Sequence, residues 1–265
     1  MPRYLRLLAC ILFCCGCWSG VAAAADQGGN VVLLMSEELD GKGAVLPIPT
    51  ETQEFFHYLE RHTRLKFEVR RYPWKRAVEN AASGEGLIFG MSKTQERLRI
   101  FKFSRSIFSD LSMLVTRCDA KFTFNSLNDL KGKTIGIVRG TSYGEEFDRL
   151  SNVLFKVEDD TNNNSGRFRK LYLRRMDAFL LYNPVISTTR LENFINKQYA
   201  GEFSGNSADK LFCILPKPVA AVDIHIAIRP DLDHGVMEKI DQAILQAQRD
   251  GELARIYSQE NRFKP

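Results

Sequence analysis

The chain has 265 residues, of which 37 are Lys or Arg and 32 are Asp or Glu, giving a formal net charge of +5. This length suits one large domain or two lobes of ordinary size. Because the charges nearly balance and no long basic run occurs, the composition excludes a nucleic-acid-binding footprint, and we expect no nucleic-acid partner.

Residues 1–25 are typical of a secretory signal peptide. Arg3 and Arg6 precede an apolar run too short to span a bilayer, and the small residues up to Ala24 suit signal peptidase. Without this leader the chain keeps 35 basic and 32 acidic residues, a net charge of +3. We therefore expect a soluble protein exported to the periplasm, with a lipid anchor at Cys17 as the less favoured alternative.

Most of the cysteines lie in the leader, which leaves only Cys118 and Cys213 in the mature chain. Their large separation in sequence leaves open whether they form a disulfide, and it supports neither a zinc site nor a CxxC redox centre. The histidines are scattered, which suggests no metal site and no catalytic pair: His57, His62, His225 and His234. We accordingly predict no cofactor, no metal and no catalytic residue.

Apolar runs and helical patterns alternate along the mature chain, which is typical of an α/β protein. In the first part we predict strands at residues 31–35, 66–70, 87–89, 101–103 and 111–117, and helices at residues 50–64 and 74–83. The pattern then restarts with strands at residues 134–138, 154–158 and 178–181, a helical turn at 127–132, and helices at 140–150 and 166–175. A strand at residues 224–228 and a long helix at 231–257 complete it.

This order predicts an α/β fold of two lobes, with two mixed sheets flanked by helices and connected by two crossover strands. Lobe 1 is expected to hold residues 26–116 and 224–265, and lobe 2 residues 117–223. A ligand is expected in the crevice between them, because pockets form preferentially at domain interfaces.

Arg97 is the most informative residue of the chain. The segment that begins at Gly90 joins an apolar stretch to a polar turn, so Ser92, Thr94 and Arg97 can point together into the crevice. A guanidinium meets a carboxylate with two parallel hydrogen bonds, and the two hydroxyls can complete the binding site. The alternative is a surface arginine paired with Glu96, a contact of little energetic value.

A second candidate segment, Gly140-Thr141-Ser142, follows the strand at residues 134–138. If it opens a helix as expected, its free backbone N–H groups and hydroxyls form an anion site. The alternative is that Thr141 or Ser142 only caps this helix. Trp74, at the start of another predicted helix, can stack on a ligand or cover its cation, or can simply pack in the core.

Four segments, in the right order, resemble family 3 periplasmic solute-binding proteins, the receptors of polar amino acid ABC importers. They are residues 90–97 with 103–104, 130–137 with 140–142, 175–178 with 184–185, and 250–257. This resemblance implies that Arg97 binds a ligand carboxylate, with Ser92, Thr94 and Thr141 as hydroxyl partners. It also implies a small-molecule ligand and an inner-membrane ABC permease as partners, and we expect a monomer.

The chain departs from this family at Tyr182, where members that bind α-amino acids place an aspartate for the ligand ammonium. Ordinary α-amino acids are therefore expected to bind weakly unless Glu37 or Glu38 supplies the negative charge; otherwise the ligand is a carboxylate without an amine. Two alternatives stay open: a periplasmic enzyme on the same scaffold, such as a cyclohexadienyl dehydratase, and a ligand-sensing partner of a membrane receptor. Because no His, Glu or Lys is convincingly placed for catalysis, we predict a solute-binding protein and not an enzyme.

Overall fold

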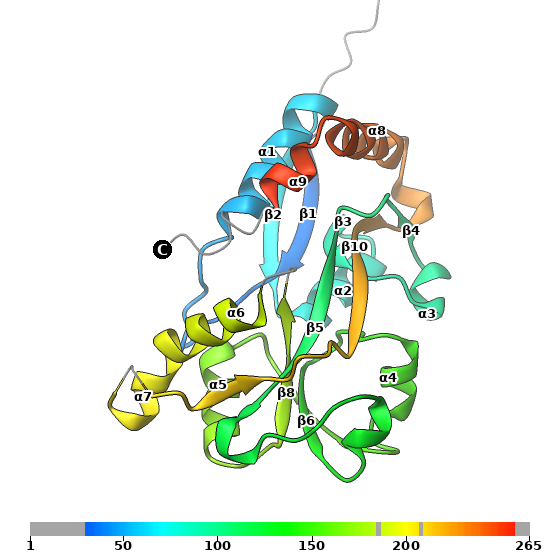
Figure 1. Cartoon of the computed structure of the whole chain (residues 1–265). Helices are drawn as coiled ribbons and strands as arrows, with labels where there is room; N and C mark the ends of the chain where they lie inside the picture. The colour runs from blue at the N-terminus through cyan, green and yellow to red at the C-terminus, as the bar shows by residue number, and fades with distance from the viewer. Residues whose placement is uncertain (1–29, 184–186, 207–208, 258–265) are drawn as a thin grey trace, which may run out of the picture.

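The computed structural model describes residues 30–183, 187–206 and 209–257 (Figure 1). The predicted signal peptide and the anchor position Cys17 lie outside these residues. The described strands are β1 (Asn30–Ser36), β2 (Lys66–Tyr72), β3 (Leu87–Met91), β4 (Lys102–Phe103), β5 (Phe108–Arg117), β6 (Thr134–Val138), β7 (Lys156–Asp160), β8 (Ala178–Asn183), β9 (Phe212–Ile214) and β10 (Ala220–Ile228).

The described helices cover both faces of the strands. They are α1 (Thr50–Thr63), α2 (Trp74–Ala82), α3 (Gln95–Leu98), α4 (Glu145–Leu150), α5 (Asn164–Tyr172), α6 (Thr188–Ile195), α7 (Gly201–Ser204), α8 (Val236–Arg249) and α9 (Glu252–Ile256). Shorter helical turns are η1 (Cys118–Ala120), η2 (Leu127–Leu130), the π-helical η3 (Asn196–Ala200) and η4 (Pro230–Leu232). The predicted α/β class is confirmed.

Hydrogen bonds connect the strands in the order β2-β1-β3-β10-β5-β8-β6-β7, with β4 beside β10 and β9 beside β5. β1 is parallel to β2 and β3, and β6 is parallel to β7 and β8, whereas β5 and β10 are antiparallel to their neighbours. The two mixed sheets that the sequence predicts are connected through β10. Its first half pairs with β5 and its second half, from His225, pairs with β3 and β4.

Each lobe is built around its own buried side chains (Figure 1). In the first lobe, Phe55 of α1 and Ile240 of α8 belong to one cluster, in which both side chains are fully buried. In the second lobe, Phe179 and its neighbour Leu180 on β8 belong to different clusters, because successive strand residues point to opposite faces of the sheet. Burying a side chain of this size stabilises the fold by about 1.5–3 kcal/mol.

β5 and β10 are the strands that pass between the lobes (Figure 1). Phe108 at the start of β5 packs against the first-lobe cluster, whereas Met113 belongs to a second-lobe cluster. The pairing of β10 changes from β5 at Ile224 to β3 at His225, and its register against β3 shifts between His225 and Ile226. We propose that the chain crosses between residues 108 and 113 and again near residue 225, so the first crossing is earlier than the predicted boundary at residue 116.

The single helix predicted at residues 231–257 is wrong in detail. The segment divides into η4, α8 and α9, with the chain turning at Gly235 and Gly251. The helical pattern of apolar residues spans these breaks, because all three pieces bury their apolar faces against the same lobe. The helices α6 and α7 and the short strand β9 were not predicted at all, although α6 carries buried apolar residues at helical spacing, Leu191 and Ile195.

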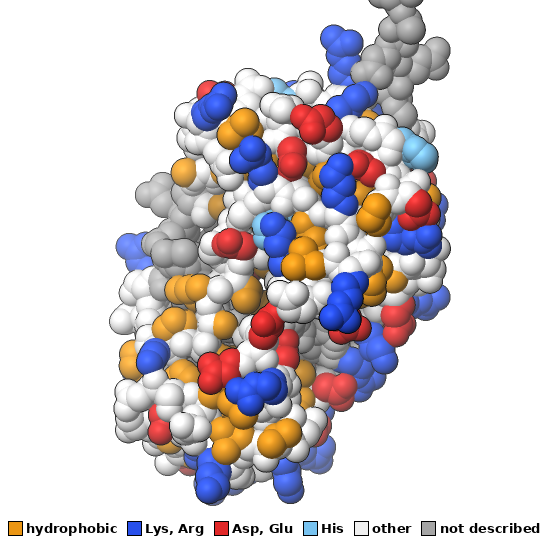
Figure 2. Space-filling model, turned by 90° about the vertical axis from the view of Figure 1, so that its right-hand side faces the viewer, with side chains coloured by type: hydrophobic (Ala, Val, Ile, Leu, Met, Phe, Trp, Pro, Cys, Tyr) orange, Lys and Arg blue, Asp and Glu red, His pale blue; other side chains and the backbone are white. Residues whose placement is uncertain are grey.

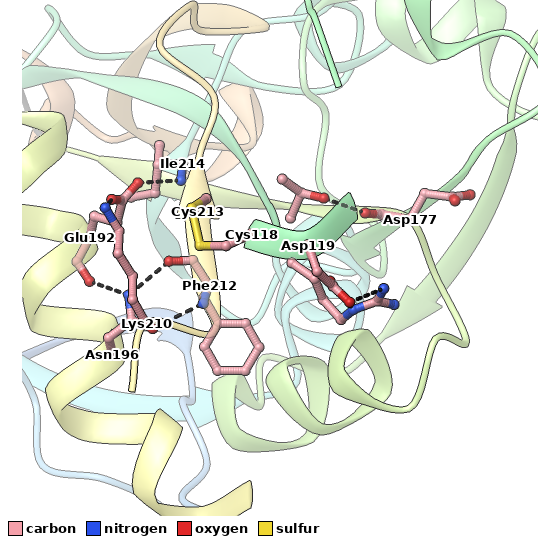
Figure 3. The surroundings of a disulfide bond; sticks show 11 residues. Cys118, Asp119, Asp177, Glu192, Asn196, Lys210, Phe212, Cys213 and Ile214 are labelled. Carbon is pink, nitrogen blue, oxygen red and sulfur yellow. Dashed lines mark hydrogen bonds and ion pairs between the residues drawn. A yellow bond between two sulfur atoms is a disulfide. The ribbon is translucent and has the colours of Figure 1, made fainter. Parts of the chain in front are cut away.

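Cys118 and Cys213, which lie 95 positions apart, form a disulfide that joins the end of β5 to β9 (Figure 3). The side chains of α6 and η3 hold the outer edge of β9. Asn196 donates to the Phe212 carbonyl at 2.7 Å and accepts from its N–H at 2.9 Å, and the Glu192 carboxylate accepts a further β9 N–H at 2.9 Å. These bonds satisfy an edge strand that would otherwise be unpaired.

The surface carries charges of both signs, interspersed on the face shown in Figure 2 without a patch of one sign. Within the described ranges, no helix combines the length and apolarity that crossing a bilayer requires.

Candidate functional site

A cavity of about 330 Å³ lies between the two lobes. The parallel strands of both lobes end at it: Ser36 is the last residue of β1, Ser92 follows β3, and Val138 is the last residue of β6. The carboxyl ends of parallel strands are where open α/β sheets place ligands. The crossover strands also contribute, through Asp110 of β5 and Ile224 of β10.

Arg97 lies in the short helix α3 and is buried, with 8% of its surface exposed. Its Nη1 donates to both the carbonyl oxygen and the Oγ of Ser92, at 2.9 Å each, and its Nη2 donates to the Gly140 carbonyl of the second lobe at 3.0 Å. Thr94 caps α3, because its hydroxyl accepts from the Arg97 backbone N–H at 3.2 Å. Burial lowers the pKa of Arg97, yet a guanidinium remains charged in proteins.

The hydrogen bonds that Arg97 makes within the described structure leave donors of its guanidinium for a ligand. All three start from the Nη1 and Nη2 atoms, and none of them uses the Nε–H. A guanidinium has five N–H donors, so the Nε–H and at least one Nη hydrogen can meet a carboxylate. Arg97 is therefore held in place by the protein while keeping donors for a carboxylate.

The Gly140 carbonyl is a contact point between the lobes. It accepts from Arg97 and also from the Trp74 indole Nε1 at 3.1 Å, and the Arg97 guanidinium lies 6.0 Å from the Trp74 ring centre. Both donors come from the first lobe and the acceptor from the second. The residue that would bind a ligand carboxylate thus also joins the two lobes.

On the other side of the cavity the lobes touch again. The Leu39 N–H donates to the Asn162 carbonyl at 2.9 Å, and the Asn164 side-chain amide donates to the Glu38 carboxylate at 2.6 Å. Burial raises the pKa of Glu38 above its usual value, although Arg167, Asn164 and Arg71 favour its ionised form. The lobes therefore contact each other at two places beside the cavity, through Gly140 and through Glu38 and Leu39.

Tyr182 lines the cavity from β8 and stacks on Tyr143, with ring centres 5.5 Å apart. Burial holds the pKa of Tyr182 well above its usual value, so it presents a neutral hydroxyl. The carboxylate of Asp110 stands on the adjacent strand. Ser112 is directly opposite Tyr182, and Asp110 shares the face of Ser112 because strand side chains alternate with a period of two. Position 182 itself is a tyrosine, but the carboxylate of Asp110 lies close to it.

The segment 140–144 differs from the prediction. The expected helix start at residues 140–142 is wrong, because α4 begins only at Glu145, after Gly144 at φ +100°. The Asp148 carboxylate accepts from the Ser142 hydroxyl and from the Tyr143 N–H, which holds the segment as a non-helical turn. Thr141 still lines the cavity, but not as part of a helix N-terminus.

The cavity brings together most of the residues that the sequence singles out: Gly90, Ser92, Arg97, Trp74, Thr141 and Tyr182. Three others do not line it. Thr94 caps α3, Ser142 bonds to Asp148, and the residue of the acidic pair that reaches the cavity is Glu38 and not Glu37. Sequence analysis missed Asp110, Arg71 and Arg167, because a strand or helix residue gives no sign of which face meets a cavity.

Comparisons with known proteins agree with this architecture. Residues 52–260 match the sequence model of the bacterial extracellular solute-binding proteins, family 3. The chain belongs to this family. Its function is therefore solute binding, and the family is extracellular. A relative of this family 3 protein, the arginine-binding extracellular protein ArtP of Bacillus subtilis (strain 168), is 26% identical over 97% of this chain and 96% of ArtP.

Solved structures share the fold of this family 3 protein. An ancestral arginine-binding protein bound to arginine superposes with a TM-score of 0.66 at 20% identity, covering 90% of this chain and all of that one. The GluR0 ligand-binding core from Nostoc punctiforme in complex with L-glutamate gives a TM-score of 0.65 at 16% identity, covering 89% of this chain. At these identities the similarity establishes the two-lobed fold. The ligand has to be inferred from the cavity of this chain.

Gly140 is expected to control how closely the lobes approach. It has φ +78°, and a Cβ at this position would lie 3.0 Å from the Cβ and 3.1 Å from the Cα of Lys75 in the first lobe. Overpacking of this kind costs about 1–3 kcal/mol. In Gly140→Ala, ligand affinity measured by calorimetry should therefore fall by roughly 5- to 150-fold.

Gly132→Ala is the matched control for this substitution. Gly132 has a similar φ of +74°, but a Cβ there would meet no atom within 4 Å. Both variants should lose stability through the strained φ, by about 1–3 kcal/mol. Only Gly140→Ala should lose affinity; equal affinities in the two variants would show that the Gly140 contact does not limit closure.

Proposed function

We propose that this protein captures a small ligand bearing both a carboxylate and an ammonium group and delivers it to an inner-membrane ABC importer. The arrangement of Arg97 is the observation that carries the proposal. Arg97 is buried between the lobes, bonded to Ser92 and Gly140 through its Nη atoms, and keeps its Nε–H for a carboxylate. A volume of about 330 Å³ lies at the small end of ligand cavities and suits a ligand of amino-acid size.

The acids of the cavity support an ammonium group on the ligand. With Tyr182 in place of the usual aspartate, ordinary α-amino acids would bind weakly, because an ammonium taken from water needs an anionic partner. Asp110 and Glu38 both line the cavity, which revises that expectation. Asp110 is the preferred ammonium partner, since it lies on the strand next to Tyr182 and on the same face.

Closure of the lobes by a hinge would couple binding to delivery. The chain passes between the lobes in β5 and β10, and a few residues in such strands can absorb the rotation of one lobe against the other. A ligand carboxylate on Arg97 would favour the closed form, because the same guanidinium donates to Gly140 across the cleft. A closed, liganded monomer in the periplasm would then present itself to the permease.

Titration of the mature protein with the common amino acids tests this function. A ligand at 100 times its dissociation constant should stabilise the protein by about 2.7 kcal/mol, which a thermal-shift screen detects before calorimetry measures the affinity. NMR of the bound and released ligand should find it chemically unchanged. If no amino acid binds, the proposed ligand class is wrong; if a ligand is converted, the enzyme alternative replaces transport.

A further inference from the structure

The cavity is lined by more positive than negative side chains. Its charged residues within the described structure are Arg71, Arg97, Arg167, Glu38 and Asp110. We propose that the ligand is an anionic amino acid, whose second carboxylate binds between Arg71 and Arg167 while its α-carboxylate binds Arg97. This inference rests on the proposed function and narrows its ligand to amino dicarboxylates such as glutamate and aspartate.

Two of these arginines have a buried donor without an acceptor. The Nε atoms of Arg71 and Arg167 have no hydrogen-bond partner among the described residues, although both atoms are inaccessible to solvent. Buried polar groups of native proteins are nearly always hydrogen-bonded, and each exception calls for an explanation. Both side chains line the cavity, so a ligand oxygen can accept from these donors only after the guanidinium groups shift, because the present arrangement closes off both Nε atoms.

Arg167, which belongs to the second lobe, is held in place by hydrogen bonds from its guanidinium. Arg167 is 3% exposed; its Nη1 donates to the Leu180 carbonyl at 2.9 Å and its Nη2 to the Asn164 side chain at 2.6 Å. Its guanidinium also lies 4.9 Å from the ring centre of Phe179. A charge this deeply buried is costly unless another charge compensates it.

Glu38 compensates only part of the charge at this end of the cavity. It interacts electrostatically with both Arg167 and Arg71. Glu37 also interacts with Arg71, and Asp160 with Arg167, from outside the cavity lining, so the excess of one positive charge holds for the lining side chains alone. Burial raises the pKa of Glu38, and protonation of that carboxyl would only enlarge the excess. Arg97 and Asp110 carry opposite charges, so the whole cavity keeps a net charge of +1.

The net charge of the ligand decides how well it complements this cavity. An amino dicarboxylate has a net charge of −1 at neutral pH and would neutralise the site, whereas glutamine leaves the excess and arginine raises it to +2. Complementary charge across an interface mainly provides specificity against wrong partners. Arg71 belongs to the first lobe and Arg167 to the second, so the second carboxylate would join the lobes as the first does at Arg97.

Calorimetry of the mature protein with L-glutamate, L-aspartate, L-glutamine, L-arginine and succinate tests this inference. Glutamate or aspartate should bind at least tenfold more tightly than glutamine, which has nearly the same shape as glutamate, and arginine should bind most weakly of the amino acids. Tighter binding of glutamine or arginine would overturn the inference but preserve the proposed function. Binding of succinate alone would preserve the anionic site and overturn the ammonium part of the proposed function. No binding by any of them would overturn both.

Arg71→Gln provides the residue-level test, because Arg71 is less buried than Arg167 and its loss endangers the fold less. Glutamate affinity should fall at least tenfold, while glutamine affinity changes less than threefold. Arg70→Gln is the control, since Arg70 pairs with Glu68 and Glu85 and does not line the cavity. Equal losses for glutamate and glutamine in Arg71→Gln would show that Arg71 does not bind a second carboxylate.

Discussion

Replacing Arg97 with alanine should abolish ligand binding and leave the two-lobed fold intact. Breaking a buried charge pair by removing one partner costs about 3–5 kcal/mol, because the other charge stays buried without compensation. Affinity should therefore fall at least about a hundredfold, since each 1.4 kcal/mol is a factor of ten. The substitution also removes the Nη2 bond to the Gly140 carbonyl, so the closed arrangement of the lobes loses a contact at the same time.

Calorimetry with the tightest amino-acid ligand measures this loss, and circular dichroism checks the fold. Arg99→Ala is the matched control, because Arg99 ends the same short helix but is exposed to solvent. Arg97→Lys keeps the charge and loses the planar pair of donors, so its affinity should lie between those of the wild type and the alanine variant. Wild-type affinity in Arg97→Ala would remove Arg97 from the site.

Removing the disulfide should have the largest effect on stability. Cys118 and Cys213 close a loop spanning 95 positions, which contains most of the second lobe. Native disulfides typically stabilise by about 2–4 kcal/mol, mainly by restricting the unfolded chain, and more for longer loops. The double variant Cys118→Ser/Cys213→Ser should therefore unfold at a clearly lower urea concentration than the wild type.

A reducing agent supplies the control for this prediction. It should lower the stability of the wild type to that of the double variant and leave the variant itself unchanged. Ligand affinity should be the same in both proteins, because neither cysteine lines the cavity. A wild type that reductant does not destabilise would show that the bond contributes nothing to stability.

Sequence predicts well the elements whose signals are local. The first helix was expected at residues 50–64 and is found at Thr50–Thr63, where Arg64 in the left-handed conformation ends it. The strand at residues 134–138 is found within the same bounds. In both cases the period of the apolar residues and the neighbouring turn residues act together.

Sequence fails where spatial neighbours decide the conformation. Residues 140–144 have the composition of a helix start, but the Asp148 carboxylate bonds back to Ser142 and Tyr143 and delays the helix. Asn196, at the start of the π-helical η3, exchanges two hydrogen bonds with Phe212 of β9, a contact between segments that no local pattern reveals.

Only some residues of the candidate site could be predicted from the sequence. Arg97 could be predicted, because the family resemblance and the local turn both point to it. Asp110, Arg71 and Arg167 could not, since each lies on a strand or helix whose cavity-facing side is set by how the two lobes pack. The charge of the cavity, and with it the class of ligand, therefore emerges only when all five charged side chains are placed together.

A crystal structure of the mature protein with its tightest amino-acid ligand tests the central claim most directly. The ligand should lie between the lobes, with its α-carboxylate oxygens within about 2.7–3.2 Å of the Nε and Nη2 atoms of Arg97. Its ammonium should contact Asp110. A ligand bound elsewhere, or one in the cavity whose carboxylate makes no contact with Arg97, would contradict the account.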